Sequence, residues 1–182
     1  MKLLGIDTSN YTTSCAWYDT DTDRIIQKKQ LLPVAEGQAG LRQSDAVFHH
    51  TRQLPQMISQ LAEALQGTPL KPDAIGVSVS PRPEEGSYMP CFEAGRSSAE
   101  QLGAVLKVPV RCFSHQEGHI EAALYSAGVR ETIGETFAAF HVSGGTTELL
   151  RVRSGSIEKL GGTLDISEIG RASCRERVLL IV

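Results

Sequence analysis

The order of strand-like and helix-like stretches constrains the fold of this chain more than any single motif does. Strands are predicted where apolar residues alternate or run together, and helices where they recur every three or four positions. The strands are expected at residues 2–7, 13–18, 24–32, 74–80 and 109–113, and the helices at 46–65, 92–106 and from 115 onward. Pro55 lies inside the first helix, where it can cause a break or kink. This β-β-β-α-β-α-β-α order predicts an α/β fold with helices packed on a mixed sheet, as in one lobe of the ribonuclease-H-like folds.

The strand pattern starts again after a polar linker at residues 128–135. Strands are expected at 136–142, 147–152 and 156–160, and the first two form a hairpin around Ser143-Gly144-Gly145-Thr146. Because this repeats the N-terminal pattern, we predict a first lobe at residues 1–130 and a second lobe of the same topology that begins at 131. The second lobe is cut off after its first strands.

The last stretch of the chain does not belong with the rest. Residues 168–178 read as the in-frame translation of a common short-read sequencing adapter, whereas the alternative is a natural basic tail. We therefore predict that the natural sequence ends near Ser167, that the second lobe is 131–167, and that 168–182 is an artefact. So few strands bury too little apolar surface to offset their ordering entropy. We expect an inactive chain with an unstable second lobe.

Composition limits the location and the partners of the protein. The 182 residues carry a net charge of −3, so any nucleic acid has to be held by a local patch or a partner. No apolar run approaches the roughly 20 residues of a membrane span. The four cysteines show no Cys-x-x-Cys spacing, which favours a reducing cytoplasm.

Two histidines four positions apart form the strongest chemical motif. His115 and His119 follow an apolar strand and begin a predicted helix, where positions i and i+4 lie on one face. Both imidazoles can reach one divalent ion there, although a plain helix start with two solvated histidines has the same spacing. Glu117 lies about 200° around the helix, so it cannot serve as the base of a His-Glu-x-x-His zinc peptidase.

Two turns of small residues resemble phosphate loops. Asp7-Thr8-Ser9 and Ser143-Gly144-Gly145-Thr146-Thr147 each offer backbone N–H groups and hydroxyls to a phosphate. Each turn alone is also typical of an ordinary connection. Because the two turns begin similar lobes, we expect the N–H groups near Ser9 and Gly144 to face one cleft.

In combination, these motifs resemble the tRNA threonylcarbamoyladenosine transferase family, whose members were formerly described as O-sialoglycoprotein endopeptidases. The resemblance covers residues 1–167 and rests on four stretches in the family's order. They are Leu4-Gly5-Ile6-Asp7-Thr8-Ser9, Val77-Ser78-Val79-Ser80-Pro81 leading to Gly95, His115-Gln116-Glu117-Gly118-His119, and Val142-Ser143-Gly144-Gly145-Thr146-Thr147. Gly161-Gly162-Thr163-Leu164-Asp165 is similar to the family's next phosphate-side segment.

The resemblance implies an actin-like ATPase fold with a nucleotide and a metal held between two lobes. It implies acyl transfer of a threonylcarbamoyl group from threonylcarbamoyl-AMP, made by a separate synthase, to N6 of an adenosine beside the tRNA anticodon. The implied metal ligands are His115 and His119, with iron or zinc as the ion and a third carboxylate ligand beyond this sequence. The implied nucleotide contacts are Ser9, Ser143, Gly144, Gly145, Thr146 and Thr147. The implied partners are tRNA, a non-catalytic paralogue and a small ATPase, and no membrane.

Three departures from the family pattern indicate a divergent paralogue. Tyr11-Thr12 stand where the family has Asp-Glu, which leaves Asp7 as the candidate catalytic carboxylate. Ser80-Pro81-Arg82-Pro83 replaces Gly-Pro-Gly-Leu, and Thr146 replaces a histidine. Two alternatives therefore stay open. One is a non-catalytic nucleotide-binding scaffold subunit of the tRNA-modification complex, and the other is an actin-like kinase with an acidic first loop and no histidine box.

Overall fold

The computed structural model describes residues 1–9, 11–34, 40–129, 135–142, 147–153, 156–163 and 177–181, the last of these as backbone only. It divides into two compact units, Met1–His115 and Gln116–Val182. The division falls inside the helix that carries the histidine pair, whereas the predicted lobe boundary follows that helix. Among the described helices, none is both long and apolar enough to cross a membrane.

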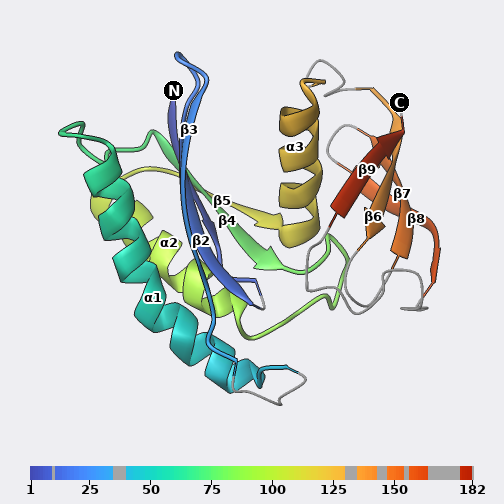
Figure 1. Cartoon of the computed structure of the whole chain (residues 1–182), viewed down its shortest axis with the longest axis horizontal. Helices are drawn as coiled ribbons and strands as arrows, with labels where there is room; N and C mark the ends of the chain where they lie inside the picture. Colours follow the sequence, from blue (N-terminus) through green and yellow to red (C-terminus); the bar gives the residue numbers. More distant parts are fainter. Residues whose placement is uncertain are drawn as a thin grey trace. The chain divides into compact units, whose positions relative to one another are not determined.

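The first unit is built on a five-stranded sheet in the order β3-β2-β1-β4-β5 (Figure 1). The strands are β1 (Lys2–Asp7), β2 (Thr12–Asp19), β3 (Arg24–Leu31), β4 (Ala74–Ser80) and β5 (Val110–Ser114). β1 and β3 are antiparallel to β2, whereas β1, β4 and β5 are parallel to one another. The crossovers are α1 (Gln43–Ala64) and α2 (Phe92–Leu106). This topology confirms the predicted actin-like, ribonuclease-H-like α/β fold.

Both helices pack on one face of this sheet because alternate strand residues point to that face. The strands contribute Leu4, Ile6, Cys15, Trp17, Ile75 and Val77, and the helices contribute Leu54, Met57, Leu61 and Ala99. Helix α1 runs without a break through Pro55, so the break considered from the sequence is not found. Burial of Leu54 and Met57 on either side of the proline offsets the roughly 3 kcal/mol that an interior proline costs a helix.

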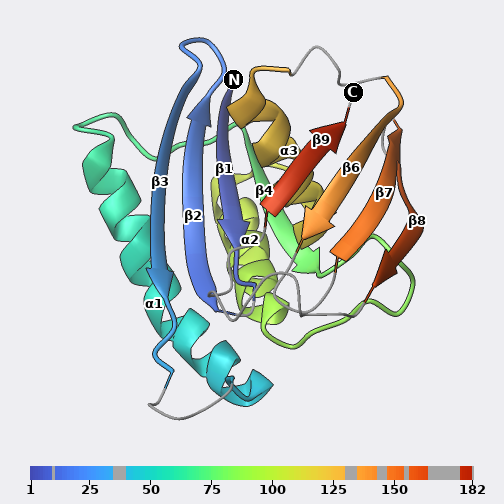
Figure 2. The same cartoon turned by 45° about the vertical axis from the view of Figure 1, so that its right-hand side comes forward.

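The second unit combines most of helix α3 with a four-stranded antiparallel sheet in the order β8-β7-β6-β9 (Figure 2). The elements are α3 (His115–Ala127), β6 (Phe137–Val142), β7 (Thr147–Arg153), β8 (Ser156–Thr163) and β9 (Arg177–Ile181). The expected strands β6, β7 and β8 are confirmed. Strand β9 was not predicted, because the sequence reasoning excluded residues 168–182 from the fold.

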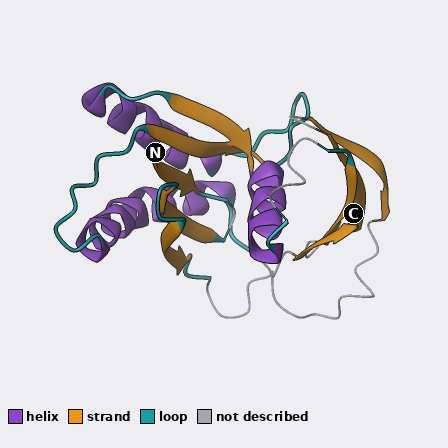
Figure 3. Cartoon of the chain, turned by 90° about the horizontal axis from the view of Figure 1, so that it is seen from above, coloured by secondary structure: helices purple, strands orange, loops and turns teal. Residues whose placement is uncertain are grey.

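Helix α3 lies along one face of the second sheet (Figure 3). Ile120 and Leu124, one turn apart on the helix, pack with Phe137, Ala139 and Leu150 of the strands. Gln116 continues this buried stripe by one turn towards the start of the helix. The histidine motif therefore contains a buried polar side chain, that of Gln116, between its two histidines in the sequence.

Candidate functional site

The carboxyl ends of three parallel strands place the first group of candidate residues. Strands β1, β4 and β5 end at Asp7, Ser80 and Ser114, and His115 follows directly. Parallel strands bring their carboxyl ends to the same edge of a sheet, which is where α/β proteins of this kind bind ligands. Asp7 and His115 therefore meet, although they are 108 positions apart in the sequence.

The contact between Asp7 and His115 is a short hydrogen bond. His115 Nδ1 lies 2.8 Å from Asp7 Oδ2, and the side chains are 21% and 24% exposed, respectively. An ionised carboxylate only accepts, so Nδ1 carries the proton and donates it. In the neutral ring the lone pair is then on Nε2, the nitrogen that a metal ion would take. Metal-bound imidazoles usually have such a carboxylate at the opposite nitrogen, so the residues present fit a metal ligand at His115.

The other oxygen of Asp7 is also occupied. The backbone N–H of Ser9 donates to Asp7 Oδ1 at 2.8 Å, which closes a turn after β1. Burial by itself would raise the pKa of the Asp7 carboxyl. The hydrogen bond and electrostatic attraction of His115, with hydrogen bonds from Ser78 and Ser9, instead lower this pKa below its usual range. Asp7 is thus an ionised carboxylate held on both oxygens.

Thr8 has an internal role in the predicted phosphate turn. Its side chain is fully buried, donates from Oγ1 to the Cys91 carbonyl at 3.0 Å and accepts from the Gly95 N–H at 3.1 Å. These two bonds attach the first turn of α2 to the end of β1. A Cβ at position 95 would lie 2.8 Å from Thr8 Oγ1, which explains a glycine at that position. The family resemblance singled out Gly95 but not this reason for it.

The second histidine of the motif meets an imidazole that sequence reasoning missed. The ring centroids of His119 and His141 are 6.0 Å apart, and the ring planes are inclined by 33°. His141 Nδ1 in turn lies 3.3 Å from Gln116 Nε2, and Gln116 Nε2 donates to Glu148 Oε2 at 3.1 Å. Strand alternation could have indicated His141, since it shares the inward face of β6 with Phe137 and Ala139.

The described residues do not contain a preformed cluster of three or more His, Cys, Asp or Glu side chains able to hold a metal ion. The His115–His119 pair offers two imidazole nitrogens, fewer than the four ligands of a tetrahedral metal site. Of the predicted second phosphate turn, Ser143, Gly144, Gly145 and Thr146 lie outside the described residues. Thr147 begins β7 and pairs with Val142 and Thr163 in the sheet.

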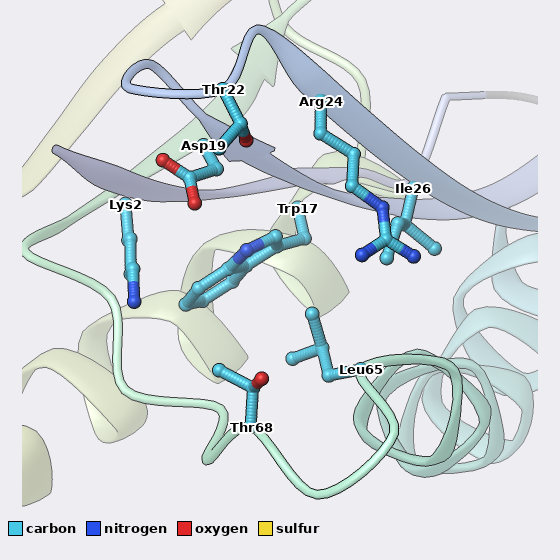
Figure 4. A pocket seen from close by; sticks show the side chains of 8 residues that line it. All are labelled: Lys2, Trp17, Asp19, Thr22, Arg24, Ile26, Leu65 and Thr68. Atoms are coloured by element: carbon cyan, nitrogen blue, oxygen red, sulfur yellow. The ribbon is translucent and has the colours of Figure 1, made fainter.

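Two surface cavities lie away from these residues. One of about 170 Å³ is at the end of β1 and β2 opposite to Asp7 (Figure 4). Its lining residues include Lys2 and Arg24, whose side chains lie to either side of Trp17 in that view. The other, of about 280 Å³, is lined by residues of the second unit, including Arg151 and Glu158. Neither cavity contains a predicted site residue.

Comparison with known proteins gives this geometry a context. The sequence model of the tRNA N6-adenosine threonylcarbamoyltransferase family matches residues 29–178. The chain belongs to this family. A family member from Aromatoleum aromaticum is 33% identical over 169 residues, which are 91% of this chain and 46% of the relative. One from Methanopyrus kandleri is 28% identical over 148 residues, which are 81% of this chain and 41% of the relative. The chain thus spans less than half the length of these relatives.

Among solved structures, YeaZ from Pseudomonas aeruginosa resembles the chain in fold. The TM-score is 0.53 at 19% sequence identity, and the alignment covers 98% of this chain and 67% of YeaZ. At this identity the likeness concerns the fold alone. The family resemblance inferred from the motifs is confirmed by the sequence comparison, and the threonylcarbamoyltransferase family supplies the chemistry to consider.

Proposed function

We propose that this chain is part of an enzyme that transfers a threonylcarbamoyl group from threonylcarbamoyl-AMP to N6 of an adenosine beside the tRNA anticodon. The observation that carries the proposal is the His115–His119 pair on α3, with the Asp7 carboxylate 2.8 Å from His115 Nδ1, in a member of the threonylcarbamoyltransferase family. The pairing orients an imidazole as metal enzymes do. A solvated histidine would not need a carboxylate held in this way.

His115 and His119 are the proposed ligands of one divalent ion, iron or zinc, since imidazole suits both metals. When bound, the ion supplies Lewis acidity that polarises the mixed anhydride. Asp7 orients His115 and keeps its Nδ1 protonated. Because both carboxylate oxygens already accept hydrogen bonds, we assign Asp7 this orienting role and not that of a general base.

The small-residue turns are the proposed holders of the nucleotide phosphate. Since the Ser9 N–H donates to Asp7, the hydroxyl of Ser9 is the group that remains for a phosphate oxygen. Backbone N–H groups and hydroxyls of Ser143, Gly144, Gly145, Thr146 and Thr147 are the proposed counterpart. These donors stabilise negative charge on the phosphate as it departs.

The proposed reaction is an acyl transfer. The N6 amine of adenosine attacks the carbamoyl carbon, a new C–N bond forms, and the C–O bond to the phosphate breaks. AMP leaves with the bonding electron pair, and the proton that the amine loses passes to the surrounding water. The transfer requires the amine and the carbamoyl carbon to be held in contact, which in this proposal is the task of the phosphate turns and the bound tRNA.

Partners are proposed from the same family membership. The net charge of −3 does not favour a broad nucleic-acid surface, so a local patch or a partner subunit has to hold the tRNA. The non-catalytic paralogue and the small ATPase implied by the resemblance are the proposed partners. A tRNA substrate agrees with the cytoplasmic location expected from the cysteine pattern.

The test compares metal content and transfer activity in the protein encoded by the complete gene. Wild type, His115→Ala and His119→Ala are purified with His49→Ala, a change of a histidine on α1, as the control. We expect both motif variants to lose the bound ion and at least about 100-fold in labelled threonine transferred to tRNA, because removing catalytic charge stabilisation has effects of this size. Unchanged metal content in the His115→Ala/His119→Ala double variant would show that the metal assignment is wrong.

The scaffold alternative has one observation in its favour. Tyr11-Thr12 replaces the acidic pair of the family, and Asp7, the nearest carboxylate in the sequence, is occupied by His115 and Ser9. A scaffold subunit would bind adenine nucleotide and the partner subunit but would transfer no threonylcarbamoyl group with any tRNA. An actin-like kinase would instead consume ATP when offered a small acceptor, so an ATP turnover assay and the tRNA transfer assay together separate the three possibilities.

A further inference from the structure

The cavity of about 170 Å³ lies between the first sheet and the end of helix α1 (Figure 4). The starts of β1 and β3 and the end of β2 contribute to its lining, together with Leu65 and Thr68, which directly follow α1 in the chain. All of these residues belong to the first unit, and none belongs to the histidine motif. An assignment for this cavity therefore does not depend on the proposed transfer reaction.

Part of the cavity surface is apolar. Trp17 is 2% exposed and belongs with Leu65 to the core of the first unit. Ile26 is the cross-strand neighbour of Trp17 on β3 and packs against the same core. These three side chains offer a surface that favours contact with a carbon-rich group over contact with water.

The indole N–H of Trp17 adds a hydrogen-bond donor to this surface. None of the described residues accepts a hydrogen bond from it. The described side-chain atoms that are sealed from solvent and lack a partner are Nε2 of His50 and Nε2 of His141, so the indole nitrogen is not sealed and reaches the cavity. A largely buried N–H is unfavourable unless a group accepts from it, and this donor therefore favours a ligand with an acceptor.

Two cationic side chains lie to either side of that donor. Lys2 and Arg24 both line the cavity, with Trp17 between them (Figure 4). The ion pairs among the described residues include neither of these two side chains. Asp19, the cross-strand neighbour of both, is the one carboxylate in the lining, so two positive charges stand against one negative charge. The excess of positive charge favours an anion.

We propose that this cavity binds a small organic anion with a short apolar body. The apolar body lies on the surface formed by Trp17 and its two apolar neighbours. The anionic group, a carboxylate or a phosphate, accepts from the indole N–H and is attracted by Lys2 and Arg24. An inorganic anion would leave the apolar surface uncovered, whereas a neutral apolar molecule would leave the N–H without an acceptor and the cations without a counter-charge.

The test uses the fluorescence of Trp17, which is the single tryptophan of the chain. The full chain is titrated with four probes: isovalerate, isopentyl phosphate, neutral isovaleramide and inorganic phosphate. We expect a saturable change in emission, with millimolar affinity, for at least one of the two organic anions, and the tighter one identifies the anionic group that fits. The amide and inorganic phosphate should bind at least about tenfold more weakly, because each lacks one half of the recognised chemistry.

Variants of the two cations test their part in binding. Lys2→Met and Arg24→Met remove one charge each and keep an apolar stem, so the cover over Trp17 is retained. Each should weaken binding of the preferred anion by at least about threefold, and the double variant by at least about tenfold, since charged hydrogen-bond donors have effects of this size. Exposed Lys29→Met on β3, outside the cavity lining, is the control and should bind as wild type does.

A second measurement needs no variant and so does not depend on how a variant folds. The indole ¹H–¹⁵N signal of Trp17 is recorded on wild type during the same titrations, and it should shift further with the preferred organic anion than with the amide. If no probe moves this signal or changes the emission, the inference is wrong. Unchanged affinity in the double variant would show that Lys2 and Arg24 only cover the indole ring. Inorganic phosphate that binds as tightly as the organic anions would show that the apolar surface takes no part, which contradicts an organic ligand.

Discussion

The two units of the molecule each place a carboxylate against an imidazole, and they stabilise the carboxylate differently. In the first unit, Asp7 and His115 are in direct contact at 2.8 Å and both side chains are partly exposed. In the second, Glu148 is almost fully buried, lies 3.7 Å from His141 Nδ1 and is balanced by the ammonium group of Lys159. The partly exposed Asp7 carboxylate is held by His115, the Ser9 N–H and Ser78, whereas the almost fully buried Glu148 carboxylate also has a cation beside it.

The largest expected effect comes from removing that cation. In Lys159→Met the Glu148 carboxylate loses the ammonium group at 2.9 Å but stays buried, where Gln116 donates to it and His141 lies farther away. Breaking a buried ion pair on one side costs about 3–5 kcal/mol, and the half-exposed Lys159 favours the lower limit, so we expect a loss of about 3 kcal/mol in the free energy of unfolding. Urea unfolding measures it, and exposed Lys29→Met on β3 is the control. Equal stability of the two variants would mean that Glu148 does not depend on Lys159.

A third imidazole, that of His50, extends the comparison because none of the described carboxylates lies within hydrogen-bond distance of it. His50 on α1 is fully buried, with Nδ1 2.7 Å from Thr13 Oγ1. Thr13 Oγ1 donates to Gln53 Oε1, so Nδ1 is the donor in its contact with Thr13. Burial lowers the pKa of His50 to about 4, although the charge of Asp7 acts in the opposite direction.

This depressed pKa makes stability depend on pH. Below the unfolded pKa of about 6.5, the unfolded chain takes up a proton that the folded chain refuses until about pH 4, so stability falls as the pH falls through this window. Between about pH 6.5 and about pH 5 we expect a loss of roughly 1.5 kcal/mol. Urea unfolding at several pH values should show a shallower dependence for His50→Gln than for wild type. The same slope in both proteins would rule out His50 as its source.

Removing the charge of Asp7 tests the carboxylate–imidazole contact of the first unit. Asp7→Asn removes the carboxylate charge but keeps an oxygen that can accept from His115 Nδ1. We expect zinc affinity to fall by about tenfold, the lower limit for a partner of a ligating imidazole, because the amide is a weaker acceptor. Chelator competition on the full chain measures this loss. If Asp7→Asn binds zinc as wild type does, the contact at His115 has no role in metal binding.

The sequence predicted the fold in detail and the site only in part. Strands β1 and β4 and helix α2 begin and end at the predicted residues, because their apolar periodicity and their flanking turns agree. Helix α1 continues through Pro55, where the sequence allowed a break or kink, because burial of the neighbouring leucine and methionine outweighs one lost hydrogen bond.

The contacts of the candidate site depend on tertiary structure. His115 and His119 could be found from their spacing, whereas the Asp7–His115 bond joins residues 108 positions apart and the Glu148 contacts join a helix to two strands. No local pattern encodes such pairings. Asp7 was selected as a catalytic carboxylate, and its hydrogen bonds now favour an orienting role.

The smallest expected effects come from a matched pair of helical glycines, one on α2 and one on α3. A Cβ added at Gly95 on α2 would lie 2.8 Å from Thr8 Oγ1, whereas none of the described atoms lies within 4 Å of a Cβ added at Gly118 on α3. Alanine favours a helix over glycine by up to about 1 kcal/mol, so Gly118→Ala should raise the free energy of unfolding by roughly 0.5–1 kcal/mol.

Gly95→Ala gains the same helix preference but has to displace Thr8, which is fixed by two hydrogen bonds. Overpacking of this kind costs about 1–3 kcal/mol, so the net result should be a loss of about 1 kcal/mol, measured by urea unfolding beside Gly118→Ala. Stabilisation by both substitutions would show that Thr8 can move and that the turn after β1 is not held rigidly beside Asp7.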